Sequence, residues 1–296
     1  MTERPWPLLF WKMAIIKLPN STLDLSGPCL IMAIVNCNGD SFYPSSRALG
    51  RDAADKALAA EQEGASIIDF GAESSRPGSS YIDAEEEISR VIPVIEAFRQ
   101  KSVLPVSIDT RKAKVARLAL EAGADIINDI SALEDDKDMA PLAAKTGAAV
   151  ILVHKKGDPQ TMQISPVYDD VLAEVGAYLK SAANRALAAG IGRDRIILDP
   201  GFGFGKNTED NLVLLACLAE IRRSGYPLLV GLSHKSFVKE ILGRDSAEDL
   251  AGTLAASAAA VMAGADIIRV HETREHADLV KVLDALAGAK KRQGRQ

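Results

Sequence analysis

The sequence is poor in cysteine, and its charge balance is not basic. Its 296 residues include only Cys29, Cys37 and Cys217, and no two of them form a CxxC pair. An odd number at this spacing argues against a disulfide framework and a structural zinc site, and is typical of a protein of the reducing cytoplasm. The formal net charge of −5 argues against a nucleic-acid-binding protein, which usually carries a basic patch.

Long hydrophobic runs are missing as well. No stretch approaches the ~18 consecutive apolar residues of a transmembrane helix. The N-terminal MTERPWPLLFWKMAII is interrupted by two prolines and a lysine, and no clear small-residue cleavage site follows it. We therefore interpret residues 1–22 as a leader into the first strand, residues 23–290 as one domain and residues 291–296 as a basic tail. We expect a cytoplasmic protein with no nucleic-acid or membrane partner.

Short runs rich in isoleucine and valine recur along the chain, separated by stretches of helical pattern. Continuous apolar strands that alternate with helices indicate parallel βαβ units whose sheet is covered on both faces. Eight such units in roughly 250 residues predict a single (β/α)8 TIM barrel. A doubly wound sheet is the alternative, but it usually shows a glycine fingerprint after its first strand, and none is present here. The eight runs are CLIMAIVN, SIIDFG, PVSIDT, DIINDI, AAVILVH, RIILDPG, PLLVGLS and DIIRVH.

A polar side chain stands at the C-terminal end of each run. Active sites of this barrel lie on that face, and buried polar groups cost free energy unless they are partnered. One or two such residues would be ordinary helix caps, but a whole ring around one mouth indicates a binding site. The ring comprises Asn36, Asp69, Asp109, Asn128 with Asp129, His154, Asp199, Ser233 to Lys235, and Arg269 with His271.

The glycine-rich stretch IILDPGFGFGKN, residues 196–207, is not a phosphate-binding P-loop. The P-loop template would need a glycine at position 200 and a hydroxyl at position 207, where the chain has Pro200 and Asn207. The segment is instead a buried strand that ends in a carboxylate, Asp199, and leads into a turn.

The chemistry of the ring points to a flat heterocycle and an anion. Carboxylates accept paired N–H bonds from fused amino and lactam groups. Asp109 and Asp199 offer such acceptors, and Asn128 and Lys235 add an amide and a cation. Arg269 and His271 lie two residues apart on the last strand and so face the same way, at a position where barrels commonly bind phosphate. Asn36 could complete a magnesium–phosphate arrangement, because Mg²⁺ needs few protein ligands when phosphates supply the rest.

Each histidine and acidic run also has an ordinary structural interpretation. His154 fits a hydrogen-bonded core residue as well as a site residue, and His276 is expected on the solvated surface of the last helix. A metal site formed by His154, His234 and His271 is not favoured, because the chain has neither an HxH pair on its first strand nor an HExxH motif. The acidic run at residues 84–89 fits a solvated helix start.

From about residue 23 onward the chain resembles dihydropteroate synthase, the folate-pathway enzyme inhibited by sulfonamides. The matching segments come in the family's order and at comparable spacing: IMAIVNCNGDSF, DFGAESSRPGS, VSIDTRKAKVARLALEAGADIINDIS, HKKGDPQTMQ, IILDPGFGFGKNTEDNLVLL, VGLSHKSF and DIIRVHE. The resemblance implies that p-aminobenzoate displaces pyrophosphate from the diphosphate ester of hydroxymethyl-dihydropterin, giving dihydropteroate. It also implies a homodimer that uses Mg²⁺.

The resemblance assigns roles to residues at the strand ends and loops. Pterin binding is implied for Asp109, Asn128, Asp199, Lys235, His234 and Phe204. Pyrophosphate binding is implied for Asn36, Ser75, Arg269 and His271, with Asn36 also at the metal. Binding of p-aminobenzoate is implied for Ser75, Arg76, Pro77, Phe204 and Ser236. Catalytic roles are implied for Asp109, Lys235, Asp40 and Arg76.

The chain departs from the family pattern in three places. Asn38 and Gly39 replace threonine and proline in the first loop, which should loosen it. Ser75 stands where threonine is usual, and His234 replaces an arginine that packs over the pterin. These changes leave two alternatives open: a pterin-binding methyltransferase that acts on methyltetrahydrofolate and a corrinoid, and a non-catalytic pterin-binding paralogue.

Overall fold

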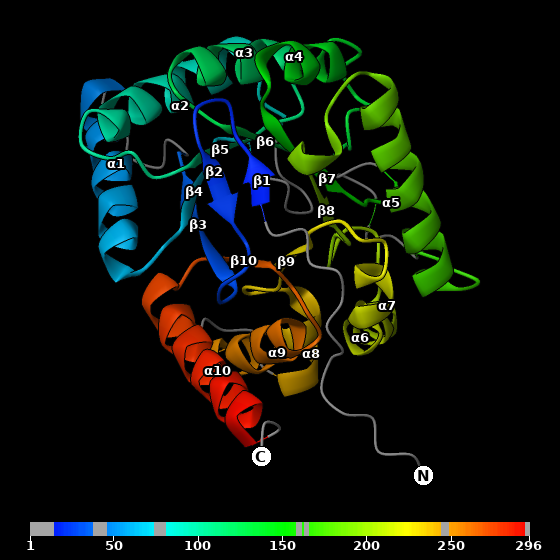
Figure 1. Ribbon diagram of the computed structural model, residues 1–296. Coiled ribbons are helices and arrows are strands. Elements are labelled where there is room, and N and C mark those ends of the chain that lie inside the picture. Colours follow the sequence, from blue (N-terminus) through cyan, green and yellow to red (C-terminus); the bar gives the residue numbers. More distant parts are fainter. Residues whose placement is uncertain are drawn as a thin grey trace.

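Eight parallel strands form a closed barrel surrounded by helices (Figure 1). The computed structural model describes residues 15–37, 46–73, 81–157, 162, 166–243 and 249–293, with the backbone alone for residues 46–51 and 291–293. The sheet order is β8-β7-β6-β5-β4-β3-β10-β9, and a bridge between Leu198 and Leu228 joins the two ends. The strands are β3 (Leu30–Asn36), β4 (Ile67–Gly71), β5 (Val106–Asp109), β6 (Ile126–Asp129), β7 (Ala149–Val153), β8 (Ile196–Asp199), β9 (Leu229–Gly231) and β10 (Ile267–Val270).

The predicted barrel is confirmed, and each strand lies within one of the eight apolar runs. The runs are apolar throughout because both faces of the strands are buried. On β4, for example, Ile67 belongs to the cluster inside the barrel, while Ile68 and Phe70 belong to the layer between sheet and helices. This alternation fixes which side chains point into the barrel and carries them up to its C-terminal mouth.

A short antiparallel hairpin fills the opposite, N-terminal end of the barrel. It consists of β1 (Ile15–Lys17) and β2 (Thr22–Asp24), which lie across the strands in Figure 1. Ile16, Leu18, Leu23 and Leu25 of this segment are buried in the same cluster as the strand residues that fill the barrel. Part of the segment expected as a leader therefore contributes to the core, while the domain boundaries themselves stay a prediction.

Helices connect the strands and cover the outside of the barrel (Figure 1). Their starts follow ordinary capping chemistry: Asp83 accepts a hydrogen bond from the Glu86 backbone at 2.8 Å, and Asn207 and Asp210 form a capping box. In the described part of the chain, no helix is long and apolar enough to cross a bilayer. The helices are α1 (Ser46–Glu63), α2 (Ala84–Arg99), α3 (Ala113–Glu121), α4 (Met139–Thr146), α5 (Val171–Ala188), α6 (Thr208–Ala216), α7 (Leu218–Arg222), α8 (Ser236–Leu242), α9 (Leu250–Met262) and α10 (Thr273–Gln293), with a 3-10 turn at Arg193–Arg195.

The predicted solvated helix start is confirmed for Glu85 and Glu86 but is wrong for Glu87, and the predicted surface position of His276 is wrong. Glu87, in the acidic run expected to be solvated, is fully buried and pairs with Lys112 at 2.6 Å. His276 is fully buried between α10 and α9, where its ring nitrogens lie 2.6 Å from the Glu272 carbonyl and 3.2 Å from the Ser257 hydroxyl. Each of these side chains contacts a residue distant in sequence, Lys112 or Ser257, and a local pattern does not contain that information.

Candidate active site

Arg269 of β10 lies at the centre of the polar ring. Its Nε is 2.6 Å from Asp69 Oδ2, and its Nη2 is 2.7 Å from Asp109 Oδ2. Asn128 also donates to Asp69 Oδ2, at 3.2 Å. The structure therefore brings together three residues predicted for the site, Asp109, Asn128 and Arg269, and joins them through Asp69.

Asp69 was assigned no role from the sequence, although it belongs to the ring of strand-end residues. It is fully buried, and its second oxygen accepts no hydrogen bond within the described chain. Its position at the end of a strand was the available signal. What the sequence could not give is that the partner lies 200 residues further along.

Asp109 and Asp199 are held in an environment that favours the neutral form of their carboxyl groups. Burial raises the pKa of Asp109, and the Arg269 guanidinium opposes this effect. Burial likewise raises the pKa of Asp199, against the opposing effects of the Gly201 backbone N–H at 2.7 Å and of the Lys235 and Arg269 charges. A ligand that donates N–H bonds to such carboxyl groups stabilises their charged form, which burial alone disfavours.

The glycine-rich turn after β8 is shaped by close backbone approach. Gly201, Gly203 and Gly205 all have positive φ angles, of 66°, 78° and 65°. A Cβ on Gly201 would lie 1.9 Å from the carbonyl oxygen of His154, and one on Gly203 would lie 3.1 Å from Cδ of Lys235. Glycine is therefore needed at these positions both for the backbone conformation and for space.

Lys206 ties this turn together from inside. Its ammonium group is buried and lies 2.8 Å from the Gly201 carbonyl, 3.2 Å from the Phe204 carbonyl and 2.9 Å from Nδ1 of His154. Burial lowers the pKa of Lys206 to about 7, and burial together with the Lys206 charge lowers the pKa of His154 to about 3. His154 is thus a buried core histidine whose Nδ1 contacts the Lys206 ammonium. In the stretch IILDPGFGFGKN, Lys206 occupies the lysine position of the P-loop template that the chain does not match, and the sequence alone predicts no other role for it.

Phe204 and Lys235 form one wall of the mouth. The Lys235 ammonium lies 4.2 Å from the centre of the Phe204 ring, a cation–π distance. Lys235 also serves as the N-cap residue of α8, and Ser236 follows as the exposed first residue of that helix. Asp199, Phe204, Lys235 and Ser236 thus come from two neighbouring strand-to-helix connections, as the sequence predicted.

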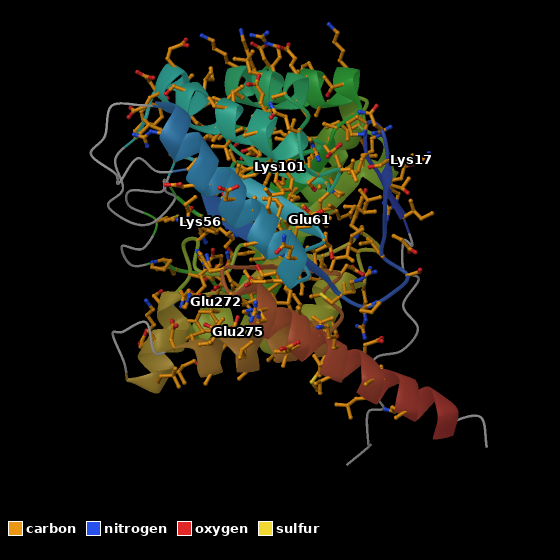
Figure 2. The ribbon with its side chains drawn as sticks, turned by 90° about the vertical axis from the view of Figure 1, so that its left-hand side faces the viewer. Lys17, Lys56, Glu61, Lys101, Glu272 and Glu275 are labelled. Atoms are coloured by element: carbon orange, nitrogen blue, oxygen red, sulfur yellow. The ribbon has the colours of Figure 1, made fainter. Side chains whose placement is uncertain are left out.

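A cavity of about 370 Å³ opens between α1, the end of β3 and the start of α10. Asn36, His271, Thr273 and Lys56 are among its lining residues. Figure 2 shows Lys56 on α1 and Glu272 beside the start of α10 on this side of the molecule. Two residues predicted for pyrophosphate, Asn36 and His271, therefore share one opening, while Arg269 is engaged with the two acids of the ring.

His234 lies between two carboxylates. Its Nδ1 is 2.5 Å from Asp249 Oδ1, and its Nε2 is 2.6 Å from Glu272 Oε1. Its ring centre is 5.4 Å from that of His271, whose Nδ1 lies 2.9 Å from the Ser233 hydroxyl. The ring of His234 is thus held beside the predicted pyrophosphate residue, and its stacking on a pterin stays a prediction.

Four predicted site residues, Asp40, Ser75, Arg76 and Pro77, lie outside the described residues. The positions that flank residues 74–80 are described and contact the same basic pair. Glu73 lies 3.2 Å from Arg111 and 2.7 Å from Lys112, and the ring centre of Tyr81 lies 5.3 Å and 4.7 Å from the same two cationic groups.

The fold and the mouth define a (β/α)8 barrel enzyme whose strand ends suit a flat ligand rich in N–H groups. The family model described as pterin binding enzyme matches residues 32–271. The dihydropteroate synthase of Escherichia coli K12 is 44% identical over 271 residues, which cover 91% of this chain and 95% of that protein.

Solved structures agree with this relationship. The dihydropteroate synthase of Xanthomonas albilineans with 4-aminobenzoic acid has a TM-score of 0.86 and 39% identity, covering 93% of this chain and 98% of that one. The Yersinia pestis dihydropteroate synthase, solved with a sulfonamide drug complex, has a TM-score of 0.87 and 39% identity, covering 93% of this chain and 99% of that one. The chain belongs to the pterin-binding enzyme family, and the predicted resemblance is confirmed.

Proposed function

We propose that this chain condenses 6-hydroxymethyl-7,8-dihydropterin diphosphate with p-aminobenzoate to give 7,8-dihydropteroate and pyrophosphate. The observation that carries this proposal is the set of strand-end groups around Arg269, found in a chain that is 44% identical to a dihydropteroate synthase. The mouth offers buried acceptors for the pterin N–H groups, and the neighbouring cavity offers Asn36 and His271 for the diphosphate.

In this proposal Asp109, Asp199 and Asn128 hold the pterin ring, and Lys235 lies along its edge. The bond between the exocyclic carbon and the diphosphate oxygen breaks, and its electron pair leaves with pyrophosphate. The amine nitrogen of p-aminobenzoate then bonds to that carbon and loses a proton. Ring nitrogens stabilise positive charge on the carbon, and preorganised groups that stabilise the departing anion accelerate the step.

We propose Asn36, Arg269, His271 and Ser75 as the pyrophosphate residues, with Asn36 at a Mg²⁺ ion. In the part of the chain that the structure describes, no cluster of three or more His, Cys, Asp or Glu side chains is placed to hold a metal. A single amide oxygen beside an anion cavity fits an ion that takes its other ligands from phosphate and water. When bound, Mg²⁺ would neutralise charge that develops on the leaving group.

For the amine substrate we propose Phe204 and Ser236 at the rim, together with Ser75, Arg76 and Pro77. We also propose that Asp40 and Arg76 take part in catalysis, that the enzyme works in the cytoplasm and that it forms a homodimer. These last proposals rest on likeness to the family.

The decisive assay measures pyrophosphate release from the dihydropterin diphosphate with Mg²⁺, with and without p-aminobenzoate. Release that depends on the amine, with dihydropteroate as product, is expected. Tight pterin binding without release would favour the non-catalytic paralogue, and methyl transfer from methyltetrahydrofolate to a corrinoid would favour the methyltransferase.

A further inference from the structure

The backbone at His234 is unusual for a residue with a side chain. Its φ angle is 54°, in the left-handed region that favours glycine, and its amide lies 3.4 Å from the Thr253 hydroxyl of α9. A non-glycine residue in this conformation carries a conformational cost that its surroundings must offset. At His234 the two hydrogen bonds of the ring provide that compensation.

Both ring nitrogens of His234 face carboxylate oxygens, Nδ1 at Asp249 and Nε2 at Glu272. Ionised carboxylates only accept hydrogen bonds, and both nitrogens of a histidine are donors only when the ring is protonated. The Asp249 side chain is fully buried, and its other oxygen has no hydrogen-bond partner within the described residues. Among the described residues, the contact with His234 is therefore what stabilises the buried Asp249 carboxylate.

The same carboxylates connect His234 to the substrate-binding residues. Glu272 accepts from His234 through Oε1, and its Oε2 lies 3.3 Å from the Ser233 hydroxyl, which in turn contacts Nδ1 of His271. Along the chain, His234 directly precedes Lys235. The ring of His234 thus links the β9–α8 loop, which carries Lys235, to the β10–α10 loop, which carries His271.

We propose that His234 acts as an imidazolium positioning residue, which fixes Lys235 and His271 relative to each other and makes turnover depend on its protonation. This inference rests on the proposed function and deepens it. Its consequence is a loss of kcat/KM on the alkaline side, at a pH where an arginine in the same place would still be charged.

The charges around the ring favour its protonated form. Burial lowers the pKa of His234, but the hydrogen bonds and charges of Glu272 and Asp249 outweigh it, so that the pKa is raised. The pKa of Glu272 is lowered correspondingly, since the hydrogen bond and charge of His234 outweigh its burial. Among the residues that the structure describes, His271 and His276 on the β10–α10 side also interact with the ring, and Lys235 follows it directly in the chain.

The first test compares pH profiles of kcat/KM for the wild type and for His234→Gln, His234→Arg and Glu272→Gln. Glutamine cannot carry the charge, so His234→Gln should lower kcat/KM on the order of 10-fold at pH 6.5 and remove the alkaline fall that the wild type shows. Arginine should keep activity to higher pH than histidine does. Removing the Glu272 charge should move the alkaline fall to lower pH.

Glu275→Gln is the matched control, because Glu275 is an exposed glutamate in the first turn of α10, beside Glu272 in Figure 2. It removes the same charge without removing a contact to the ring, so its profile should match the wild type. If Glu275→Gln shifted the profile as much as Glu272→Gln, or if His234→Gln kept the wild-type profile, the proposal would be overturned.

A second measurement does not depend on catalysis or on the folding of a variant. Nitrogen-15 NMR of the histidine rings in the wild-type chain follows the titration of His234 directly. We expect the ring to stay doubly protonated above the pH at which an ordinary histidine titrates. A ring that loses its proton in the ordinary range would overturn the inference, whether or not the chain makes dihydropteroate. Calorimetry with inorganic pyrophosphate and Mg²⁺ should show affinity falling over the pH range in which the ring titrates, and pH-independent affinity would also overturn it.

Discussion

Two histidines on different sides of the barrel mouth have pKa values that are shifted in opposite directions. His154, after β7, faces the buried ammonium of Lys206, and its pKa is lowered to about 3. His234, after β9, faces two carboxylates, and its pKa is raised. Both side chains are histidines in loops that follow a strand. The partners supplied by the fold, rather than the residue type, therefore decide the direction in which each pKa is shifted. On the β8 side, the turn held by Lys206 surrounds a neutral ring. On the β9–β10 side, His234 lies between Asp249 and Glu272, and these three residues form an electrostatic clamp.

The largest expected effect is at Lys235, which contacts Phe204 on the first side and follows His234 on the second. Lys235→Ala should lower kcat on the order of 10³-fold, because it removes a positive group from the proposed site of charge development. Circular dichroism should show an unchanged fold. Asp199→Ala is expected to abolish turnover as well, and near-normal activity of either variant would show that the site is assigned wrongly.

Rigidity of the β8 side is tested by replacing Gly201. A Cβ there would lie 1.9 Å from the His154 carbonyl oxygen, so Gly201→Ala should cost about 4 kcal/mol of unfolding free energy. Gly243, at the end of α8, is the control: its φ of 61° is similar, and no atom of the described residues lies within 4 Å of the added Cβ. Gly243→Ala should therefore cost only about 1 kcal/mol. Equal losses in urea denaturation would mean that backbone strain, and not the close approach, is what glycine relieves at position 201.

The electrostatic clamp is tested through stability as a function of pH. His234→Ala leaves Asp249 buried without its partner, and we expect it to cost about 2 kcal/mol. Because the folded pKa of His234 is raised, its contribution is complete below the ordinary histidine pKa and disappears as the pH rises through the raised value. The difference in unfolding free energy between wild type and variant should shrink correspondingly toward alkaline pH. A difference that does not change with pH would argue for a neutral ring.

The opposite slope is expected for His154. Its folded pKa is about 3, so the unfolded chain takes up a proton below the ordinary histidine pKa while the folded chain does not. His154→Gln should remove this acid penalty, making the variant roughly 2 kcal/mol less sensitive to a change from pH 6.5 to pH 5. Parallel curves for the two proteins in this range would show that His154 accepts a proton in the fold.

The sequence predicted the barrel and most strand-end residues because both depend on local patterns. Eight apolar runs, each followed by a polar residue, are visible without any knowledge of contacts. Partners are not visible in this way. Asp69 was noted without a role because its cation, Arg269, is 200 residues away. Burial of Glu87 and His276 is not visible in the sequence, because their contacts with Lys112 and Ser257 join residues that are far apart in the chain.

His234 marks the limit of the resemblance. From the motif alone it was compared with the arginine that it replaces and assigned a stacking role. Its left-handed backbone and its two carboxylate partners come from the packing of α9 and α10 against the loop, which the motif does not encode. Of the positions that depart from the family pattern, His234 is the one that the structure describes, and its contacts come from the structure and not from the motif.

The β1–β2 hairpin at the base of the barrel has a consequence for the order of events. Its apolar side chains and the inward-facing strand residues form one cluster that fills the barrel, so in the proposed reaction the pterin, the amine and both products would share the opening at the C-terminal end. Where all ligands pass through one opening, the ligand that binds deepest has to bind first and is released last. For the proposed reaction the pterin would enter before the amine, and dihydropteroate would leave after pyrophosphate.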